Sequence, residues 1–486
     1  MSENYQIEQF NIENPPGLYS KRGSSFSTGS GVSDDIESNE NIIFESDSSS
    51  LDSDLKGKAG VKKECGLTSN SEISVILNIV VSAIGSGCFS FPYIMYDGGI
   101  VVSLVILLFM TACFYYTIDL LRSFVVDTKY FSFALMTETI LGPKWLKLYA
   151  FCSFIIYTSM EVGYLSSIYI YIQGIFDFTS VWATILYFLV SMLIEIIICL
   201  YISKVSKMYL LSIISIICFT VLFFSLIIIS IIANIRGDVD KKFTVENLFF
   251  PRISPDSAVN RLLKMSSYIM EYLYGYSYHS TFPTLIGNLH TINNSTTKRV
   301  HLISFSIIFF SYLFMTIFGF ILSDEVPQEV FKENEKHFTG VWAYLRIPYK
   351  ITLCVYYLTL IPIRFVVVRD NYATLIGEKK ITFMNELIII SVFIFISNIF
   401  VFGVGIFDRL PIKDLNIKTM LQAFGGMFGV IISFCLPVVN YVSVNGKKKI
   451  KSIIGYFITG FFVIVGFFST AYTFYQLFFG GRQKDN

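Results

Sequence analysis

The sequence has little charge for its length. Only 15% of its 486 residues are Asp, Glu, Lys or Arg, whereas 53% are hydrophobic and the mean hydropathy is +0.61. A water-soluble domain cannot bury so many apolar side chains in a core, so the composition predicts a polytopic membrane protein whose surface contacts the lipid bilayer. The formal net charge of +1 gives no reason to expect a surface for nucleic acid.

Residues that build metal sites and disulfides are also scarce. The 4 histidines are scattered, and no CxxC pair occurs among the 8 cysteines, which lie almost entirely within apolar runs. This pattern argues against a metal site and predicts free, buried thiols. No motif places a nucleophile beside a base, so we do not expect an enzyme. We expect no cofactor and no metal.

The chain divides into a polar tail and a long apolar part. Residues 1–70 are rich in Ser, Asp, Glu and Asn, cannot bury enough apolar surface to offset chain entropy, and are predicted to be a disordered cytosolic tail. Residues 71–486 are predicted to form the transmembrane domain, with about eleven apolar runs of about 20 residues or more. These runs lie near 73–95, 99–124, 148–176, 180–203, 208–235, 263–287, 300–323, 345–370, 383–407, 418–443 and 452–480.

Basic residues gather in alternate short loops between these runs. The short loops near 96–98 and 177–179 contain no Lys or Arg. The positive-inside rule therefore predicts a cytosolic N-terminus, and an odd number of spans places the C-terminus on the other side. The plasma membrane and an acidic vacuole fit this topology equally well.

Two of the predicted spans contain residues that disrupt a helix. The first span contains "AIGSGCFSFP" at 83–92, and the sixth contains "YGYSYHSTFP" at 274–283. In a helix interior Gly costs about 1 kcal/mol and Pro about 3 kcal/mol. Freed backbone groups inside a membrane must line a cavity or be buried in protein, and many transporters interrupt the first helix of each of two inverted repeats in this way. We predict inverted repeats over 73–235 and 263–443, followed by an extra helix over 452–480.

Four segments together resemble the amino acid/auxin permease family of the amino acid-polyamine-organocation superfamily. They are "LNIVVSAIGSGCFSFPYIMYDGG", "YGYSYHSTFPTLIGNL", "LTLIPIRFVVVRDNY" and "FGGMFGVIISFCLPVVNYV". The resemblance covers residues from about 70 to 480 and extends to eukaryotic neutral and vacuolar amino acid transporters. It implies an all-α fold of five-plus-five inverted repeats with an eleventh helix, and alternating access around a central amino-acid site.

The resemblance also implies which residues would bind the substrate. The carboxylate would meet the backbone N–H groups of Gly85, Ser86, Gly87 and Cys88. The amino group would meet carbonyls near Ser82 and Ala83 and in the segment 274–277, which includes Tyr274, Tyr276 and Ser277. From its position on the third span, Tyr164 is expected to face the same cavity.

Placing an ionisable side chain inside a membrane costs free energy, so such a residue is interpreted as functional unless a structural role is found. The candidates for a coupling proton are Glu161, Glu271 and His279, with Glu195 as a further acid. Each acid could instead be capped by a hydroxyl of a neighbouring helix, and His279 could hold freed carbonyls. Arg364 is interpreted as a snorkelling or gating residue rather than as a substrate ligand.

Sodium is the less favoured coupling ion. Asn78, Ser82 and Thr359 could supply oxygen ligands, but Val81 stands where the sodium-coupled branch has a second asparagine. The sequence therefore favours proton coupling or facilitated passage.

Two functions fit these features. The first is a secondary active transporter of amino acids, and the alternative is an amino acid sensor that signals through its N-terminal tail. The sequence leaves the oligomeric state, the individual amino acids and the membrane open.

Overall fold

A computed structural model describes most of the predicted transmembrane domain. The described residues are 71–176, 181–201, 205–236, 258–322, 331, 335, 337–338, 340–377, 382–407, 426–446 and 449–479. The predicted tail, residues 1–70, lies outside this set, so its disorder stays a prediction.

Helices occupy the described part of every predicted span. In chain order they are α1 (Glu72–Ala83), a 3-10 turn η1 (Ser86–Ser90), α2 (Phe91–Gly98), α3 (Ile100–Thr128), α4 (Phe133–Leu141), α5 (Pro143–Phe176), α6 (Val181–Tyr201), α7 (Val205–Arg236), α9 (Ala258–Gly275), α10 (Phe282–Ile286), α11 (Asn294–Ile321), a 3-10 turn η2 (Gly340–Leu345), α13 (Arg346–Leu375), α14 (Phe383–Phe407), a π-helical turn η3 (Ile431–Cys435), α16 (Leu436–Asn445) and α17 (Ile450–Phe479). Among the described residues, 9 helices are long and apolar enough to cross a membrane, and the bent pair α1–α2 raises this to 10. The total of eleven spans and the inverted repeat stay predictions.

One helix was not predicted from the sequence. The segment between the second and third spans contains α4, which is only 9 residues long and too short to span a bilayer. The side chain of Ser132 caps its N-terminus by accepting a hydrogen bond from the N–H of Leu135. Gly142, at φ 94°, ends it in a conformation that favours glycine. The helix packs against α5.

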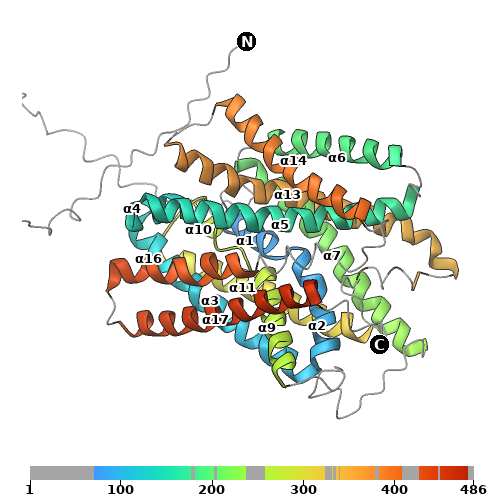
Figure 1. The fold of residues 1–486 in the computed structure, drawn as a ribbon, viewed down its shortest axis with the longest axis horizontal. Helices are drawn as coiled ribbons and strands as arrows, with labels where there is room; N and C mark the ends of the chain where they lie inside the picture. Colours follow the sequence, from blue (N-terminus) through green and yellow to red (C-terminus); the bar gives the residue numbers. More distant parts are fainter. Residues whose placement is uncertain are drawn as a thin grey trace, which may run out of the picture. The chain divides into compact units, whose positions relative to one another are not determined.

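Two helices form the centre of the bundle. The apolar windows of α5 and α13 are 78% buried, whereas those of α6 and α17 are 22% and 28% buried. The helices α5 and α13 pack against each other, and α13 also packs against α7 (Figure 1). Residues on α5 and α13 are therefore positioned to line a site inside the protein.

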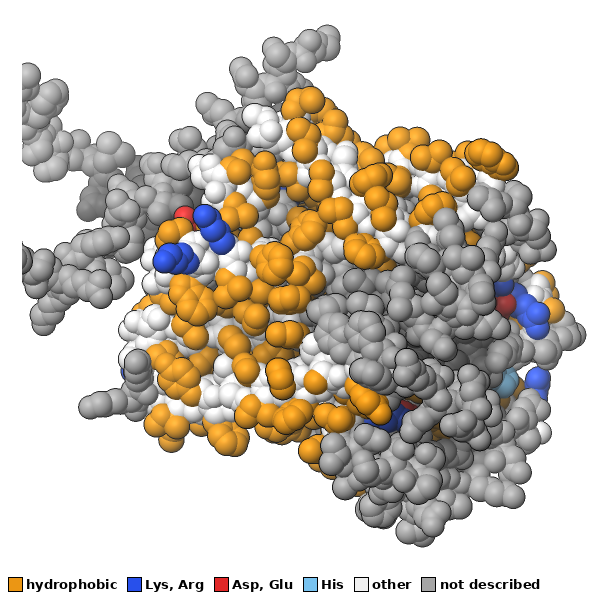
Figure 2. All heavy atoms as spheres, viewed as in Figure 1, with side chains coloured by type: hydrophobic (Ala, Val, Ile, Leu, Met, Phe, Trp, Pro, Cys, Tyr) orange, Lys and Arg blue, Asp and Glu red, His pale blue; other side chains and the backbone are white. Residues whose placement is uncertain are grey.

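The outer surface is apolar. Figure 2 shows hydrophobic side chains over most of the described part of one face, whereas Lys and Arg lie mainly near its left and right ends. On α6 the exposed side chains of the described residues are large and mostly apolar, namely Trp182, Leu186, Leu189, Val190, Leu193, Ile194, Ile197 and Tyr201. A surface of this kind is stable in lipid and not in water, which agrees with the predicted membrane location.

The cysteines follow the prediction in part. The described cysteines are free, and five of the seven are buried, whereas Cys218 and Cys435 are half-buried.

Candidate functional site

The first and sixth spans are both interrupted, as the sequence predicts. In the first, α1 ends at Ala83, the backbone of Ile84 and Gly85 is extended, and the chain resumes as η1 and α2 after a bend of 53°. In the sixth, α9 ends at Gly275 and α10 starts at Phe282. Each second half has a proline in its first turn, where the missing N–H would have no helical partner anyway.

The two interruptions lie against each other. A Cβ atom built on Gly87 would lie 3.1 Å from both the Cα and the N of Gly275, and 3.0 Å from Cδ1 of Tyr274. A Cβ atom on Gly275 would lie only 2.5 Å from Cζ of Phe91. Glycine at position 87 thus lets the two backbones approach closely, and glycine at position 275 leaves room for the ring of Phe91.

Tyrosine hydroxyls hold carbonyls that the interruptions free. The Tyr312 hydroxyl, from α11, lies 2.8 Å from the carbonyl oxygen of Ala83 and 2.7 Å from that of Gly275. Because a hydroxyl has one hydrogen, it donates to one of these carbonyls at a time. The Tyr356 hydroxyl, from α13, donates to the carbonyl of Ile84 at 2.7 Å. These contacts link the ends of the two broken helices.

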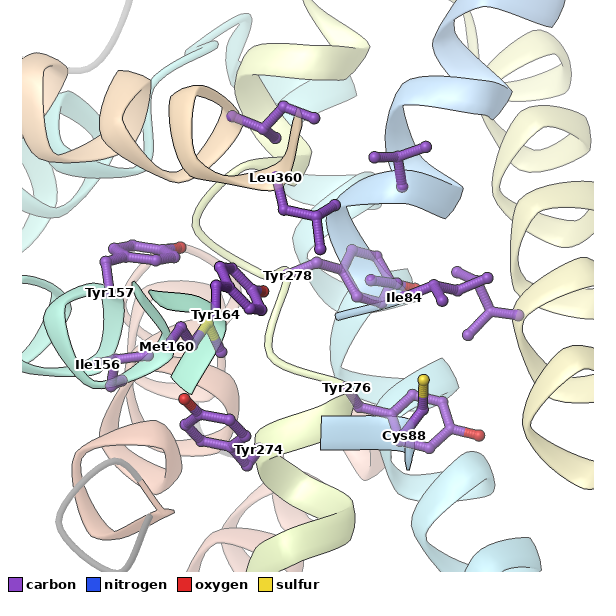
Figure 3. Close-up of a cluster of buried hydrophobic side chains, with 14 of the residues drawn as sticks. Ile84, Cys88, Ile156, Tyr157, Met160, Tyr164, Tyr274, Tyr276, Tyr278 and Leu360 are labelled. Carbon is purple, nitrogen blue, oxygen red and sulfur yellow. The ribbon is translucent and has the colours of Figure 1, made fainter. Parts of the chain in front are cut away.

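Aromatic side chains form a wall beside the first interruption. The hydroxyl oxygen of Tyr164 lies 2.7 Å from the position that a Cβ atom on Gly85 would take. Figure 3 shows Tyr157, Met160 and Tyr164 on one side of α5, with Tyr274 of α9 pointing toward them. The structure thus brings the predicted residues Tyr164 and Tyr274 to the unwound segment of the first span.

Three of the other predicted binding residues have hydrogen-bond partners of their own, namely Tyr276, Ser277 and Cys88. The Tyr276 hydroxyl lies 2.9 Å from Oγ1 of Thr111 on α3. Ser277 donates to the carbonyl of Leu273 at 2.9 Å. The Cys88 thiol donates to the carbonyl of Gly85 at 3.0 Å. Ser82 is fully buried within α1, directly before Ala83, and Ser86 begins η1.

Two buried acids lie near each other on α5 and α6. Glu161 is fully buried, and neither of its carboxyl oxygens has a hydrogen-bond partner among the described residues. Its acidic neighbour is Glu195, which accepts hydrogen bonds from Ser191 at 2.5 Å and from Asn398 at 3.0 Å. Glu195 is therefore bound by a hydroxyl of its own helix and by an amide of α14, and not by the hydroxyl of a neighbouring helix that the sequence analysis gave as an alternative.

Glu271 lies in a different environment. It is half-buried, and its electrostatic neighbours are Tyr93, Tyr268 and Tyr272. Tyr268 donates to the carboxylate of Asp97, which also pairs with Lys264. Glu271 thus lies beside a polar cluster that joins α2 to α9.

His279 connects the second interruption to α3. It is 1% exposed, and its Nε2 lies 2.9 Å from Oγ1 of Thr117. Its partner is thus a side-chain hydroxyl of another helix, and not one of the freed carbonyls that the sequence analysis proposed.

This contact gives a stability prediction. Thr117→Val removes the hydroxyl and leaves a buried ring nitrogen without its partner, which costs about 1–3 kcal/mol. We expect a lower melting temperature of the purified protein, whereas Thr139→Val on the exposed side of α4 should leave it almost unchanged. Equal melting temperatures for the two variants would show that the contact with His279 does not contribute to stability.

The candidate sodium ligands are buried neutral groups. Asn78 and Ser82 lie one turn apart on α1, and neither Oδ1 of Asn78 nor Oγ of Ser82 has a hydrogen-bond partner in the described part of the chain. Thr359 donates to the carbonyl of Tyr356 at 2.6 Å. The described residues include no cluster of three or more His, Cys, Asp or Glu that could hold a metal ion. Neutral oxygens of this kind suit sodium better than a transition metal, but they form no complete cage.

The position of Arg364 differs from the one expected from the sequence. Its side chain is 2% exposed and lies in the interior of α13, so the snorkelling interpretation is wrong. Snorkelling needs the charged head to reach water, which this burial prevents. The sequence did mark Arg364 as a charge inside a span, but it could not show which way the side chain points.

A separate cavity of about 410 Å³ lies between α5, α13 and α14. It is lined by residues on other turns of these helices, among them Lys147, Phe151, Val368, Asn371 and Val392. Its lining contains no residue of the interruptions in the first and sixth spans, so this cavity is not the predicted substrate site.

The comparisons with known proteins agree with this geometry. The sequence matches the family described as transmembrane amino acid transporter protein over residues 68–479. The chain belongs to this family. The family comprises transporters, so this protein is a multi-pass membrane transporter and not an enzyme.

Solved structures show the same fold. A manganese transporter of Eremococcus coleocola, in complex with an aromatic bis-isothiourea substituted compound, aligns with a TM-score of 0.54 at 10% identity, over 85% of this chain and 88% of that chain. A mutant of that transporter aligns with a TM-score of 0.57 at 9% identity over the same shares. No curated protein matches the sequence. At this identity the likeness shows the fold alone, which is the predicted all-α transporter fold.

Proposed function

We propose that this protein is a secondary transporter that carries amino acids by alternating access. The substrate would bind where the unwound segments of the first and sixth spans meet. The proposal is supported by the family and by one observation, the close approach of Gly87 to Gly275, whose backbone would lie 3.1 Å from a Cβ atom built on Gly87, with tyrosines around both. An interrupted pair of this kind offers backbone N–H and C=O groups to a zwitterion at a depth where lipid offers none.

Counterflow in proteoliposomes tests the proposal. Vesicles preloaded with one amino acid should take up the same labelled amino acid from outside, at acidic or neutral pH and with or without sodium. A protein that lacks residues 1–67 should do the same, because the described helices begin after them. Binding of an amino acid without counterflow by either protein would favour the alternative, a sensor. Absence of both binding and counterflow for all standard amino acids would contradict the proposal.

We further propose a proton as the coupling ion, carried by Glu161. This side chain lies one turn before Tyr164 on α5 and is buried without a hydrogen-bond partner among the described residues. The titratable groups that face it are Glu195 and Cys199 of α6. Burial without a hydrogen-bond partner disfavours the charged form of a carboxyl group. Such a group is therefore suited to bind a proton during transport rather than to stay permanently charged.

Glu161→Gln tests this assignment. The amide cannot release or take up a proton, so accumulation driven by a pH gradient should be lost while counterflow continues. Glu195→Gln serves as the matched control and should keep the pH dependence, because Ser191 and Asn398 already bind that group. An unchanged pH profile in Glu161→Gln would transfer the role to Glu271 or His279.

For the topology we propose a cytosolic N-terminus in the plasma membrane or in the membrane of an acidic vacuole. A fluorescent protein at the N-terminus, tested for access to a quencher in intact cells and again after the plasma membrane alone is permeabilised, distinguishes the two orientations in either membrane.

A further inference from the structure

Arg364 is a fully buried charge on a central helix. It is 2% exposed, and it lies on α13, a helix of 30 residues whose apolar window is 78% buried. Guanidinium keeps its proton under physiological conditions, so this group cannot avoid the cost of burial by becoming neutral. A charge in this position must be compensated by a nearby negative group. A buried charge inside a membrane span is therefore interpreted as a functional residue.

No acidic side chain compensates it among the described residues. Five acids of the described helices have other partners: Glu195 binds Ser191 and Asn398, Asp97 pairs with Lys264, Asp119 with Arg122, and Asp370 and Glu386 with Arg369. Glu161, on the neighbouring helix α5, has Glu195 as its electrostatic neighbour and not Arg364.

The groups around Arg364 are tyrosines. Its Cζ lies 5.9 Å from the ring centroid of Tyr157, and the Tyr164 hydroxyl is its hydrogen-bonding partner. A ring face compensates a cation only in part. The Nε and Nη1 atoms have no hydrogen-bond partner within the described residues, so N–H donors are left for a further ligand.

These donors lie beside the interruption of the first span. The Nη2 atom of Arg364 is 3.5 Å from the position that a Cβ atom on Gly85 would take. Gly85 is where α1 has ended and η1 has not yet begun. The charge therefore adjoins the backbone to which the sequence analysis assigns the substrate carboxylate.

We propose that Arg364 is the charged ligand of the substrate carboxylate, and that its uncompensated charge makes the transporter select substrates by net charge. Amino acids with a net negative charge neutralise the site and bind best. Zwitterions bind less tightly, and cationic amino acids are rejected. This inference rests on the proposed function, since it assigns the substrate class of the same site.

Exchange of three amino acids of similar length tests the inference. Glutamate, glutamine and lysine carry net charges of about −1, 0 and +1 at neutral pH. In proteoliposomes the native protein should exchange labelled glutamate best, with lysine at least about 100-fold lower in kcat/KM, the size expected when a second positive charge is brought into a buried positive site.

Variants of Arg364 show whether this residue determines the order of substrate preference. Arg364→Met should remove the preference for glutamate over lysine, whereas Arg364→Lys keeps the charge and should keep the order of preference at a lower rate. Arg346→Met, at the exposed start of the same helix, is the matched control and should behave as the native protein. If Arg364→Met does not fold, the order of preference in the native protein and in Arg364→Lys decides.

Two outcomes separate this inference from the proposed function. Native protein that exchanges lysine as well as glutamate, or an Arg364→Met variant that slows all three substrates equally, would overturn the inference and leave amino acid transport intact. Absence of exchange for every amino acid would overturn the proposed function, and the inference with it.

Discussion

Replacing Gly87 by leucine is expected to abolish transport while the protein stays folded. Even the first added carbon would lie 3.0 Å from Tyr274 and 3.1 Å from the backbone of Gly275, and the rest of the side chain would occupy the space between the two interruptions. Displacement of reacting or binding groups by about 1 Å can cost about 100-fold in rate. We expect counterflow at least that much slower, measured in proteoliposomes of equal protein content.

A glycine in open space serves as the control for this change. Gly460 lies on the exposed side of α17, and a Cβ atom built on it meets nothing within 4 Å. Gly460→Leu should therefore transport at the native rate. A native rate in Gly87→Leu would remove the role that we give to the backbone at the interruption.

Tyr312→Phe is expected to have the second largest effect. The change keeps the ring but deletes the hydroxyl that lies between the carbonyls of Ala83 and Gly275. A buried carbonyl that loses its donor costs about 1–3 kcal/mol. The ends of the two broken helices would no longer share a partner, so we expect a KM for substrate about tenfold higher and a lower melting temperature.

The same substitution at the surface controls for the loss of a hydroxyl. Tyr456 is 43% exposed on α17, and Tyr456→Phe should change neither KM nor melting temperature. If Tyr312→Phe resembled this control, the hydroxyl would not hold the interruptions together.

The interruptions could be predicted because they depend on local chemistry. Glycine and proline disfavour the interior of a helix, and Gly85 and Gly275 lie where α1 and α9 end, whereas Pro92 and Pro283 lie in the first turns of α2 and α10. The apolar runs follow from the thickness of the bilayer in the same way. The short helix α4 was missed because its signals, a serine cap and a terminal glycine, are common in loops as well.

The partners of the interruptions could not be predicted because they depend on how each helix is rotated. Tyr312 is one of 30 tyrosines, and nothing in its neighbourhood in the sequence distinguishes it. Arg364 was visible as a charge inside a span, but its direction is fixed by the packing of α13 against α5. The sequence thus marks which residues are unusual, and the packing decides what they contact.

A structure determined by electron cryomicroscopy with and without the amino acid that gives the highest counterflow tests the central claim most directly. We predict additional density between the segments 85–88 and 274–277, with its carboxylate end within hydrogen-bonding distance of Arg364. Density in the cavity between α5, α13 and α14, and none at the interruptions, would contradict the account.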